Sequence, residues 1–392
     1  MKYKTYKIKD LINEISMGPF GSNIKVECFV DSGIPVLNGS NLTGFALNDN
    51  SFRYVTPEKA DSLGKANAYR GDIVITHRGT LGQIVFIPEN SKHSRYVISQ
   101  SQFRVKCNEK ILPEYLVYYF HTNAGQHKLL SNASQVGVPA LARASTTFQT
   151  LEIDIPDVTE QRKIVDLLET IREKIELNNA INNNLEQQAQ AIYQQMFIDN
   201  PDPDWIEGSL SDIANITMGQ SPSGSSYNED GIGAIFFQGR AEFGFRFPTI
   251  RLYTTEPKRM AYANDILMSV RAPVGDLNVA HNDCCIGRGL AAIHSKTNHQ
   301  SFVLYTMFSL KKQLDVFNGE GTVFGSINRN SLNDMPILIP DDEQIEKFEL
   351  IVAPMDAAIR NNYEGICRLQ AVRDSLLPRL MSGELDVSNI GL

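Results

Sequence analysis

The 392-residue sequence predicts an α+β fold in which two mixed α/β domains are separated by two long helices packed as an antiparallel coiled-coil pair. Three observations support this prediction. Residues 156–197 and 339–385 both show the apolar spacing of amphipathic helices. Each of these stretches follows a segment of short β-type runs and turns. The order of runs and turns in the first segment recurs in the second, which predicts an internal pseudo-twofold repeat.

The first helical stretch covers residues 156–197. Pro156 ends the preceding segment, and Asp157 or Thr159 can accept the hydrogen bonds of an N-cap. At about 1.5 Å per residue, the helix would be roughly 57 Å long, more than the diameter of a small domain. Its apolar residues recur every three or four positions and form one stripe: Ile164, Leu168, Ile171, Ile175, Leu185, Ala189, Ile192 and Met196.

The second helical stretch opens with the same residues as the first, Ile-Pro-Asp followed by Glu-Gln. Pro354 is a site at which this helix can kink. Two such stripes in one chain can bury each other as an antiparallel pair. Alternatively, each helix lies on the surface of its own domain. The second stripe consists of Ile345, Phe348, Val352, Met355, Ile359, Ile366, Leu369, Leu376 and Leu380.

The repeat can be followed element by element. Residues 34–37 predict a strand that leads into a polar loop at Asn38, and residues 234–237 predict its counterpart before Gln238. Strand runs flank the turn at residues 76–80, and a matching run precedes Arg271. The predicted segments are a first domain, a central helical region, a second domain and a distal helical region, at residues 1–156, 157–197, 198–340 and 341–392.

Composition is that of a globular protein, with 42% hydrophobic residues. The sequence shows no signal peptide and no uncharged run of the ~18 residues that span a membrane, so we expect a cytoplasmic protein without membrane contact. Its five cysteines follow no disulfide framework, which suits reduced thiols. The net charge of −8 argues against a generic nucleic-acid binder. Residues 1–156 are nevertheless net basic, and the acidic excess lies in the later segments.

The sequence offers no candidate catalytic residues. It lacks the GxxxxGK[ST] phosphate loop, a GxGxxG between strand and helix, and the Asn/Asp-Pro-Pro-aromatic signature of amino-methyltransferases. Cysteine and histidine residues near the end of the second domain lack the paired CxxC spacing of strong zinc sites, so we predict no metal site there: His281, Cys284, Cys285, His294 and His299.

Polar residues in equivalent loops of the two halves instead indicate recognition. Arginine can bind guanine through two hydrogen bonds, asparagine and glutamine can do the same with adenine, and serine or threonine suits bases or phosphate. For Arg78 and Arg271, the alternative is an ion pair with Asp72 or Asp265; for the other loop residues, it is turn formation. The candidate DNA-binding residues are Ser22, Asn38, Ser40, Asn41, His77, Arg78, Thr80, Ser221, Gln238, Arg240, Ser269 and Arg271.

These motifs together resemble a known family. GPFGSN, DSGIPVLNGSNL, the repeated Ile-Pro-Asp opening of the helices, and the terminal LLPRLMSGELDVS at residues 376–388 are similar to patterns of the specificity subunits of type I restriction-modification systems, the HsdS type. The resemblance covers the whole chain. Each motif is weak alone, but their order and duplication make the match specific.

The resemblance implies that the two domains are target-recognition domains that each read one half of a bipartite site in double-stranded DNA, while the helices set the spacer. It implies two methyltransferase subunits as partners, which bring S-adenosylmethionine and methylate a flipped-out adenine. It also implies a restriction and motor subunit that uses ATP and Mg²⁺, and no cofactor in this chain. Lengthening the helices by one turn, roughly 5.4 Å, should then change the spacer.

Two other functions fit parts of the sequence. A two-domain scaffold that binds protein rather than DNA would suit the net charge of −8. A self-sufficient nuclease or methyltransferase would need catalytic motifs that the sequence lacks.

Overall fold

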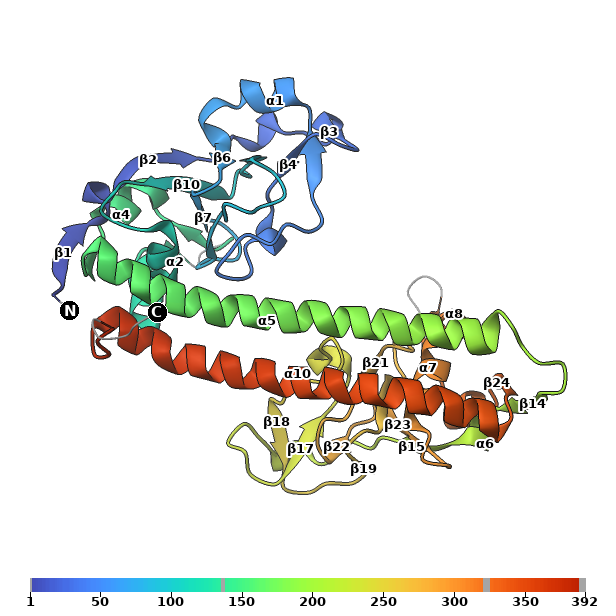
Figure 1. Ribbon diagram of the computed structural model, residues 1–392. Coiled ribbons are helices and arrows are strands. Elements are labelled where there is room, and N and C mark those ends of the chain that lie inside the picture. Colours follow the sequence, from blue (N-terminus) through green and yellow to red (C-terminus); the bar gives the residue numbers. More distant parts are fainter. Residues whose placement is uncertain (1, 135–137, 320–324, 388–392) are drawn as a thin grey trace. The chain divides into compact units, whose positions relative to one another are not determined.

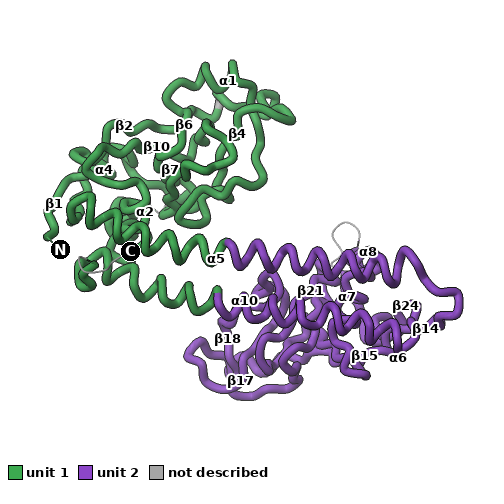
Figure 2. Tube along the Cα trace, viewed as in Figure 1, with its two compact units in different colours: residues 1–176, 366–392 green, residues 177–365 purple. Residues whose placement is uncertain are grey.

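The computed structural model describes residues 2–134, 138–319 and 325–387. The chain forms two compact units (Figure 2). Unit 1 consists of residues 1–176 and 366–392, and unit 2 of residues 177–365. Each unit therefore contains one α/β domain and a part of both long helices. The sequence analysis divides the chain into four consecutive segments, whereas the compact units each combine separate parts of the chain. The boundaries of the four segments therefore stay a prediction.

The two larger sheets of unit 1 have four and five strands (Figure 1), and β1 (Lys4–Lys7) with β13 (Glu152–Ile155) and β11 (Ala133–Ser134) with β12 (Ala140–Leu141) form two-stranded sheets. The four-stranded sheet is antiparallel, in the order β2 (Ile12–Met17), β10 (Gln102–Cys107), β7 (Ile73–Thr76) and β8 (Ile84–Phe86). In the five-stranded sheet, β4 and β9 are parallel and the remaining pairs are antiparallel. Its order is β3 (Phe29–Val30), β5 (Arg53–Val55), β4 (Ile34–Val36), β9 (Arg95–Val97) and β6 (Asn67–Tyr69).

Helix α2 (Pro113–His121) is the central helix of unit 1. Six of its residues, 115–120, are buried, and Pro113 occupies its first turn, where no backbone N–H is needed. Strands β1 (Lys4–Lys7) and β13 (Glu152–Ile155) pair antiparallel. This pairing joins the start of the chain to the segment that leads into the first long helix. The remaining elements are α1 (Pro57–Ser62), α3 (Asn123–Leu129), β11 (Ala133–Ser134), β12 (Ala140–Leu141) and α4 (Ala144–Thr150).

Unit 2 repeats this design. Its four-stranded sheet has the order β15 (Ala214–Met218), β23 (Leu290–Ser295), β20 (Ile266–Ser269) and β21 (Leu277–Val279). Its five-stranded sheet has the order β16 (Tyr227–Asn228), β18 (Leu252–Thr254), β17 (Ala234–Phe237), β22 (Cys284–Ile286) and β19 (Met260–Ala261). The other elements are β14 (Ile206–Ser209), α6 (Leu210–Ile213), α7 (Gln300–Ser309), α8 (Lys311–Asp315), α9 (Arg329–Asn333) and β24 (Pro336–Ile339).

Single turns of 3-10 helix complete both units. Two of them, η4 (Gly39–Asn41) and η8 (Arg240–Glu242), follow β4 and β17 at equivalent places in the repeat. The others are η1 (Ile8–Asp10), η2 (Gly21–Asn23), η3 (Val26–Cys28), η5 (Gly64–Ala66), η7 (Gly224–Ser226) and η9 (Val316–Asn318).

The two long helices are α5 (Val158–Tyr193), which continues as a π-helical turn to Ile198, and α10 (Asp342–Ser382). Both start at the predicted aspartates. Asp157 accepts a hydrogen bond from the backbone N–H of Glu160 at 3.0 Å, and Asp341 accepts one from that of Gln344 at 2.8 Å. Helix α10 continues without interruption past Pro354. Among the described residues, no helix is both long and apolar enough to cross a membrane.

The apolar stripes lie inside the units. In unit 1, Ile171 and Ile175 of α5 cluster with Ile366 of α10, and Leu369 and Leu376 pack against them. Ile164 and Leu168 lie in the main core of this unit. In unit 2, Ile345, Val352 and Ile359 are buried in the core, with Leu185 and Ile192 partly buried beside them. Both helices thus pack together within each unit, and the predicted fold class is confirmed.

Two glycines at equivalent positions are fixed by close backbone approach. Gly18 and Gly219 each donate a backbone hydrogen bond to the neighbouring strand, at 2.8 and 2.9 Å. A Cβ on either would overlap a backbone carbonyl oxygen, that of Ser99 or of Gly287. In both halves a methionine precedes this glycine, and the Met-Gly pair marks the place where the chain passes closest to a neighbouring segment.

We expect Gly18→Ala and Gly219→Ala each to lower the free energy of unfolding by about 1–3 kcal/mol, because backbone must shift to admit the methyl group. Urea denaturation of the purified chain measures this. Gly224→Ala is the matched control, since no atom lies within 4 Å of a Cβ at that position. If Gly18→Ala and Gly219→Ala were as stable as Gly224→Ala, the close backbone approach at these two glycines would be contradicted.

Candidate nucleic-acid interface

Three loops of unit 1 are fastened together by hydrogen bonds. The Gln83 amide, after β7, donates to the carbonyl oxygen of Gly39 in η4 at 3.0 Å and accepts from the Thr76 hydroxyl at 3.1 Å. The backbone N–H of His77 donates to the carbonyl oxygen of Ser101, in the turn between β9 and β10, at 2.8 Å. The predicted polar loops therefore form one cluster at one end of the sheets. We call the loops after β4, β7 and β9 the unit 1 loop cluster.

Some predicted residues in this cluster shape the loops rather than face solvent. Asn41 is fully buried, and its amide donates to the carbonyl oxygens of Asn48 at 3.0 Å and Asn50 at 2.8 Å. Asn38 caps the turn by accepting a hydrogen bond from the backbone N–H of Ser40 at 2.9 Å. Asn41 therefore cannot reach a ligand in this conformation, whereas Ser40 is exposed.

Arg78 and Thr80 are exposed on the loop after β7. The backbone of Arg78 bridges to Ala140, which pins the base of its side chain. The side chain makes no ion pair with any described residue. The alternative partner, Asp72, instead binds Arg104 at 3.2 Å. The Arg78 guanidinium is therefore available to a ligand.

His77 is half-buried, and its Nε2 lies 3.1 Å from the carbonyl oxygen of Gln100. Burial lowers the pKa of His77, so the ring is neutral at pH 7 and adds no positive charge to the cluster. The remaining candidate of unit 1, Ser22, belongs to η2, and its side chain lies outside the described residues.

Unit 2 assembles its loops in the same way. The backbone N–H of Gly289, between β22 and β23, donates to the carbonyl oxygen of Gln238 at 3.3 Å. The N–H of Val270 donates to the carbonyl oxygen of Gly289 at 3.0 Å, and the N–H of Arg288 donates to the Ser221 hydroxyl at 3.2 Å. The loops after β15, β17, β20 and β22 thus form the unit 2 loop cluster.

As in unit 1, some predicted residues of unit 2 stabilise the loops and others are exposed. Ser269 is 1% exposed, and its hydroxyl donates to the carbonyl oxygen of Pro273 at 2.7 Å, so it serves the turn. Arg240 forms an ion pair with Asp276. Gln238 is exposed and Ser221 is half-buried.

Arg271 is exposed, like its counterpart in unit 1. Its backbone bridges to Ser326, and its side chain makes no ion pair with any residue that the structure describes. The alternative partner Asp265 binds His294 at 2.6 Å. Both halves of the chain therefore present one exposed arginine from the same backbone position.

Two further residues occupy these clusters and escaped the sequence prediction. Gln100 and Arg288 are exposed at the tips of the β9–β10 and β22–β23 connections. The positions are equivalent, because the following residue accepts the backbone hydrogen bond from the start of the neighbouring loop in both units. Their sequence contexts, Ser-Gln-Ser and Gly-Arg-Gly, share no residue; only a polar residue midway between two strand runs could have indicated them.

The clusters suit the binding of a polar ligand. They combine exposed arginine, glutamine, serine and threonine side chains, which can donate to base edges and phosphates. Within the described parts of the chain, no group of three or more acidic, histidine or cysteine side chains could hold a metal ion.

Comparison with known proteins identifies the family. The chain matches the family described as the type I restriction modification DNA specificity domain over residues 2–187 and 203–362. It is 26% identical to a putative type I restriction enzyme MjaX specificity subunit of Methanocaldococcus jannaschii, over 98% of this chain and 94% of that protein. It is 23% identical to the type I restriction enzyme HindI specificity subunit of Haemophilus influenzae, over 88% and 93% of the two chains.

A solved structure shares the fold. The crystal structure of the type I restriction-modification system S subunit from M. genitalium aligns with a TM-score of 0.59 at 15% identity, over 97% of this chain and 96% of that one. The two family matches correspond to the two copies of the repeat, each with its α/β domain and part of a long helix. The chain therefore belongs to the family of type I restriction-modification specificity subunits.

Proposed function

We propose that this chain is the noncatalytic DNA-recognition subunit of a type I complex, and that each α/β domain reads one half of a bipartite site. The paired helices set the spacer between the halves and, with adjacent domain surfaces, dock two methyltransferase subunits. Those partners supply S-adenosylmethionine for adenine methylation. A restriction and motor subunit, which uses ATP and Mg²⁺, completes the nuclease.

One observation carries this proposal: the same loop cluster occurs in both units, with an exposed arginine at the same backbone position. Arg78 and Arg271 are held at their backbones by equivalent bridges, while the aspartates that could neutralise them bind other residues. Each unit thus holds one arginine at a fixed backbone position beside its polar loops. These two sites suit two similar ligands. The two halves of an asymmetric DNA site are such a pair.

The two loop clusters expose different side chains, which supports the recognition of a different base sequence by each unit. Unit 1 presents Ser40, Thr80 and Gln100, whereas unit 2 presents Gln238 and Arg288. Amide side chains suit adenine and guanidinium groups suit guanine, each bidentate contact contributing about 1–3 kcal/mol of discrimination. One scaffold with divergent loop tips therefore supports recognition of two sequences.

We expect binding of duplex DNA by the assembled complex to weaken as salt rises, because phosphate neutralisation releases counterions. If Arg78 or Arg271 binds a base, its replacement by alanine should cost about 1–3 kcal/mol and relax specificity at one position of one half-site. If it binds a phosphate, affinity should fall for all sequences and the salt slope should decrease by about one. Fluorescence anisotropy between 50 and 200 mM salt, the range over which such binders lose affinity strongly, measures both effects. Salt-independent affinity would instead support a protein-binding scaffold.

A genome-wide map of methylated adenine, with and without the gene in its native host, tests the proposal. We expect a bipartite motif with one fixed gap that loses methylation on deletion. Identical maps from a host that expresses the complex would overturn the proposal. Methyl transfer or DNA cleavage by the purified chain alone would instead support a self-sufficient enzyme.

A further inference from the structure

A buried arginine joins the recognition domain of unit 2 to both long helices. Arg246 lies in the loop between η8 and β18 and is only 4% exposed. Its guanidinium pairs with Glu186 of α5 at 2.8 Å and with Asp356 of α10 at 3.0 Å. A single side chain from the recognition domain thus contacts a carboxylate on each helix.

The rest of the network ties this contact to the domain interior. The hydroxyl of Tyr305, on α7, accepts a hydrogen bond from Arg246 at 3.2 Å and donates one to Asp356 at 3.0 Å. The backbone carbonyl oxygen of Arg246 accepts a hydrogen bond from the N–H of Val279 in β21 at 2.8 Å. The arginine therefore connects the four-stranded sheet, α7 and both long helices.

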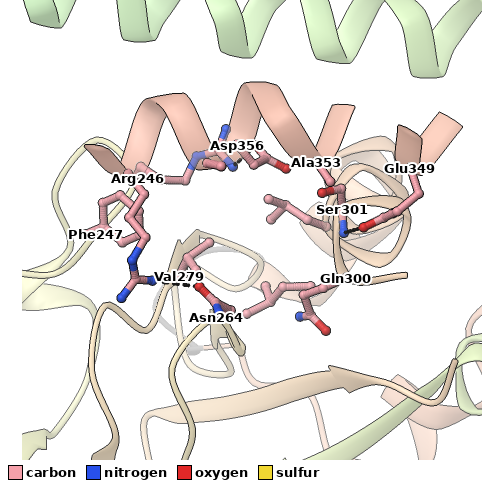
Figure 3. Close-up of a pocket in the computed structure, with 13 residues that line it drawn as sticks. Arg246, Phe247, Asn264, Val279, Gln300, Ser301, Glu349, Ala353 and Asp356 are labelled. Atoms are coloured by element: carbon pink, nitrogen blue, oxygen red, sulfur yellow. Dashed lines mark hydrogen bonds and ion pairs between the residues drawn. The ribbon is translucent and has the colours of Figure 1, made fainter. Parts of the chain in front are cut away.

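Apolar packing beside this network is incomplete. A cavity of about 340 Å³ lies next to Arg246, between the recognition domain and α10. Figure 3 shows Arg246 and Phe247 on one side, Asn264 and Val279 below, and Asp356 and Ala353 of α10 above. Around the cavity, α10 also contacts the domain through Arg360, which donates to Asn264 Oδ1 at 2.6 Å, and through Glu349, which accepts hydrogen bonds from the backbone N–H groups of Ser301 and Phe302 at 3.1 and 3.0 Å.

Unit 1 has an aromatic residue at the equivalent position of the joint. Phe45 occupies the backbone position of Arg246, because its carbonyl oxygen accepts the matching hydrogen bond, from Phe86 N–H at 3.1 Å. The Phe45 ring packs against Tyr118 of α2 with 4.7 Å between centroids. Tyr118 in turn donates to Glu169 of α5 at 2.6 Å. The same backbone position therefore carries an aromatic side chain in unit 1 and a buried, ion-paired arginine in unit 2.

We propose that Arg246 is a positioning residue that fixes the orientation of the second recognition domain on the helix pair, so that its half-site is read at only one spacer length. This inference rests on the proposed bipartite recognition. A planar guanidinium that binds two carboxylates on different helices restrains both rotation and sliding of the domain. Without it, the loop cluster of unit 2 would sample positions that match spacers one base pair shorter or longer.

The test uses a variant in which the buried charges are removed together. Arg246→Met alone would leave two half-buried carboxylates without their cation and could unfold unit 2. The triple variant Arg246→Met, Glu186→Gln, Asp356→Asn keeps similar volumes without net buried charge. Lys347→Met is the control, because it removes an exposed ion pair with Glu343 from the same helix. All variants are studied in the assembled methyltransferase complex.

Two measurements decide the outcome. In the methylation map, we expect the triple variant to keep both half-site sequences, while the fraction of methylated sites with a spacer changed by one base pair rises about tenfold, which corresponds to about 1.4 kcal/mol. In hydrogen exchange of the complex, we expect faster exchange at residues 243–248, with β20 and β23 unchanged. The control should behave as wild type in both. A more conservative variant, Arg246→Lys, should give an intermediate spacer profile, because one ammonium cannot bind both carboxylates with the arginine geometry.

An unchanged spacer in a folded, methylating triple variant would overturn the inference, whatever its exchange rates. An unchanged exchange rate at residues 243–248 would also overturn it. A wild-type complex that methylates no bipartite motif would overturn the proposed function and the spacer role together, whereas the exchange data would still show whether Arg246 holds the domain. The two failures are therefore distinguishable.

Discussion

Inserting four residues into each long helix should lengthen the preferred spacer by one or two base pairs and abolish methylation at native sites. The insertions belong after Glu176 in α5 and before Ile366 in α10, where the chain passes from one compact unit to the other. At these points they separate the apolar cluster of Ile171, Ile175 and Ile366 from the core of unit 2 without interrupting either.

The expected shift follows from helix and duplex geometry. Four residues add about 6 Å to a helix and turn it about 40° beyond one full turn. One base pair adds about 3.4 Å along a DNA strand. Both structures are right-handed, so the added rotation has the same sense as that of the added DNA. A shift of four residues is also a stutter, which helix pairs accommodate by local unwinding.

The measurement is the methylation map of a host that carries only the lengthened chain. The same four residues inserted after Gly231, in the exposed turn between β16 and β17, provide the control, because that turn lies outside both long helices. An assembled complex that still methylates native sites with the native spacer would show that the helices do not set the distance.

The helices could be predicted because one physical signal dominates them. The apolar stripe, the Ile-Pro-Asp opening and the N-cap aspartates all favour the same structure, and no tertiary contact is needed to recognise them. The sequence left open whether the stripes pair or each lies on its own domain, and the structure combines both: Ile164 and Leu168 pack into the domain core, whereas Ile171 and Ile175 pack against Ile366 of the other helix. The second stretch was predicted as one helix that can kink at Pro354, and α10 indeed continues past this proline; whether it bends there stays a prediction.

The roles of the polar loop residues are harder to predict from the sequence. Asn41 and Ser269 looked as suitable for DNA as Arg78 did, but the fold uses their side chains within the turns. Short polar side chains serve turns and ligands equally well, so local sequence cannot separate these roles. For Arg78 and Arg271, the sequence allows ion pairs with Asp72 and Asp265 as well, and the partners that these aspartates actually bind, Arg104 and His294, are distant in sequence.

The role of Arg246 could not be predicted from the sequence at all. Its role depends on Glu186 and Asp356, which are 60 and 110 residues away. No periodicity or motif links such positions, and the repeat misleads here, because the equivalent position in unit 1 is Phe45. Divergence between copies of one fold therefore indicates where each copy has its own task.

The loop tips allow a reciprocal test of base recognition. Replacing Gln100 by Arg should make guanine the preferred base at one position of the first half-site, and replacing Arg288 by Gln should favour adenine at one position of the second. Gln100 and Arg288 occupy equivalent tips, and both are exposed. Loss of a matched bidentate contact costs about 1–3 kcal/mol, so methylation of native sites should fall by roughly 5- to 150-fold in each variant.

Each substitution should change only one half of the motif, because each tip belongs to one unit. Methylation maps of the two variants and of the double variant measure this directly. Gln149→Arg on α4 is the control, since it makes the same change in unit 1 outside the loop cluster. If Gln100→Arg raised affinity for every sequence without changing the motif, the tip would contact phosphate. A native motif in all three maps would place base recognition elsewhere in the clusters, with Arg78 and Arg271 as the next residues to exchange.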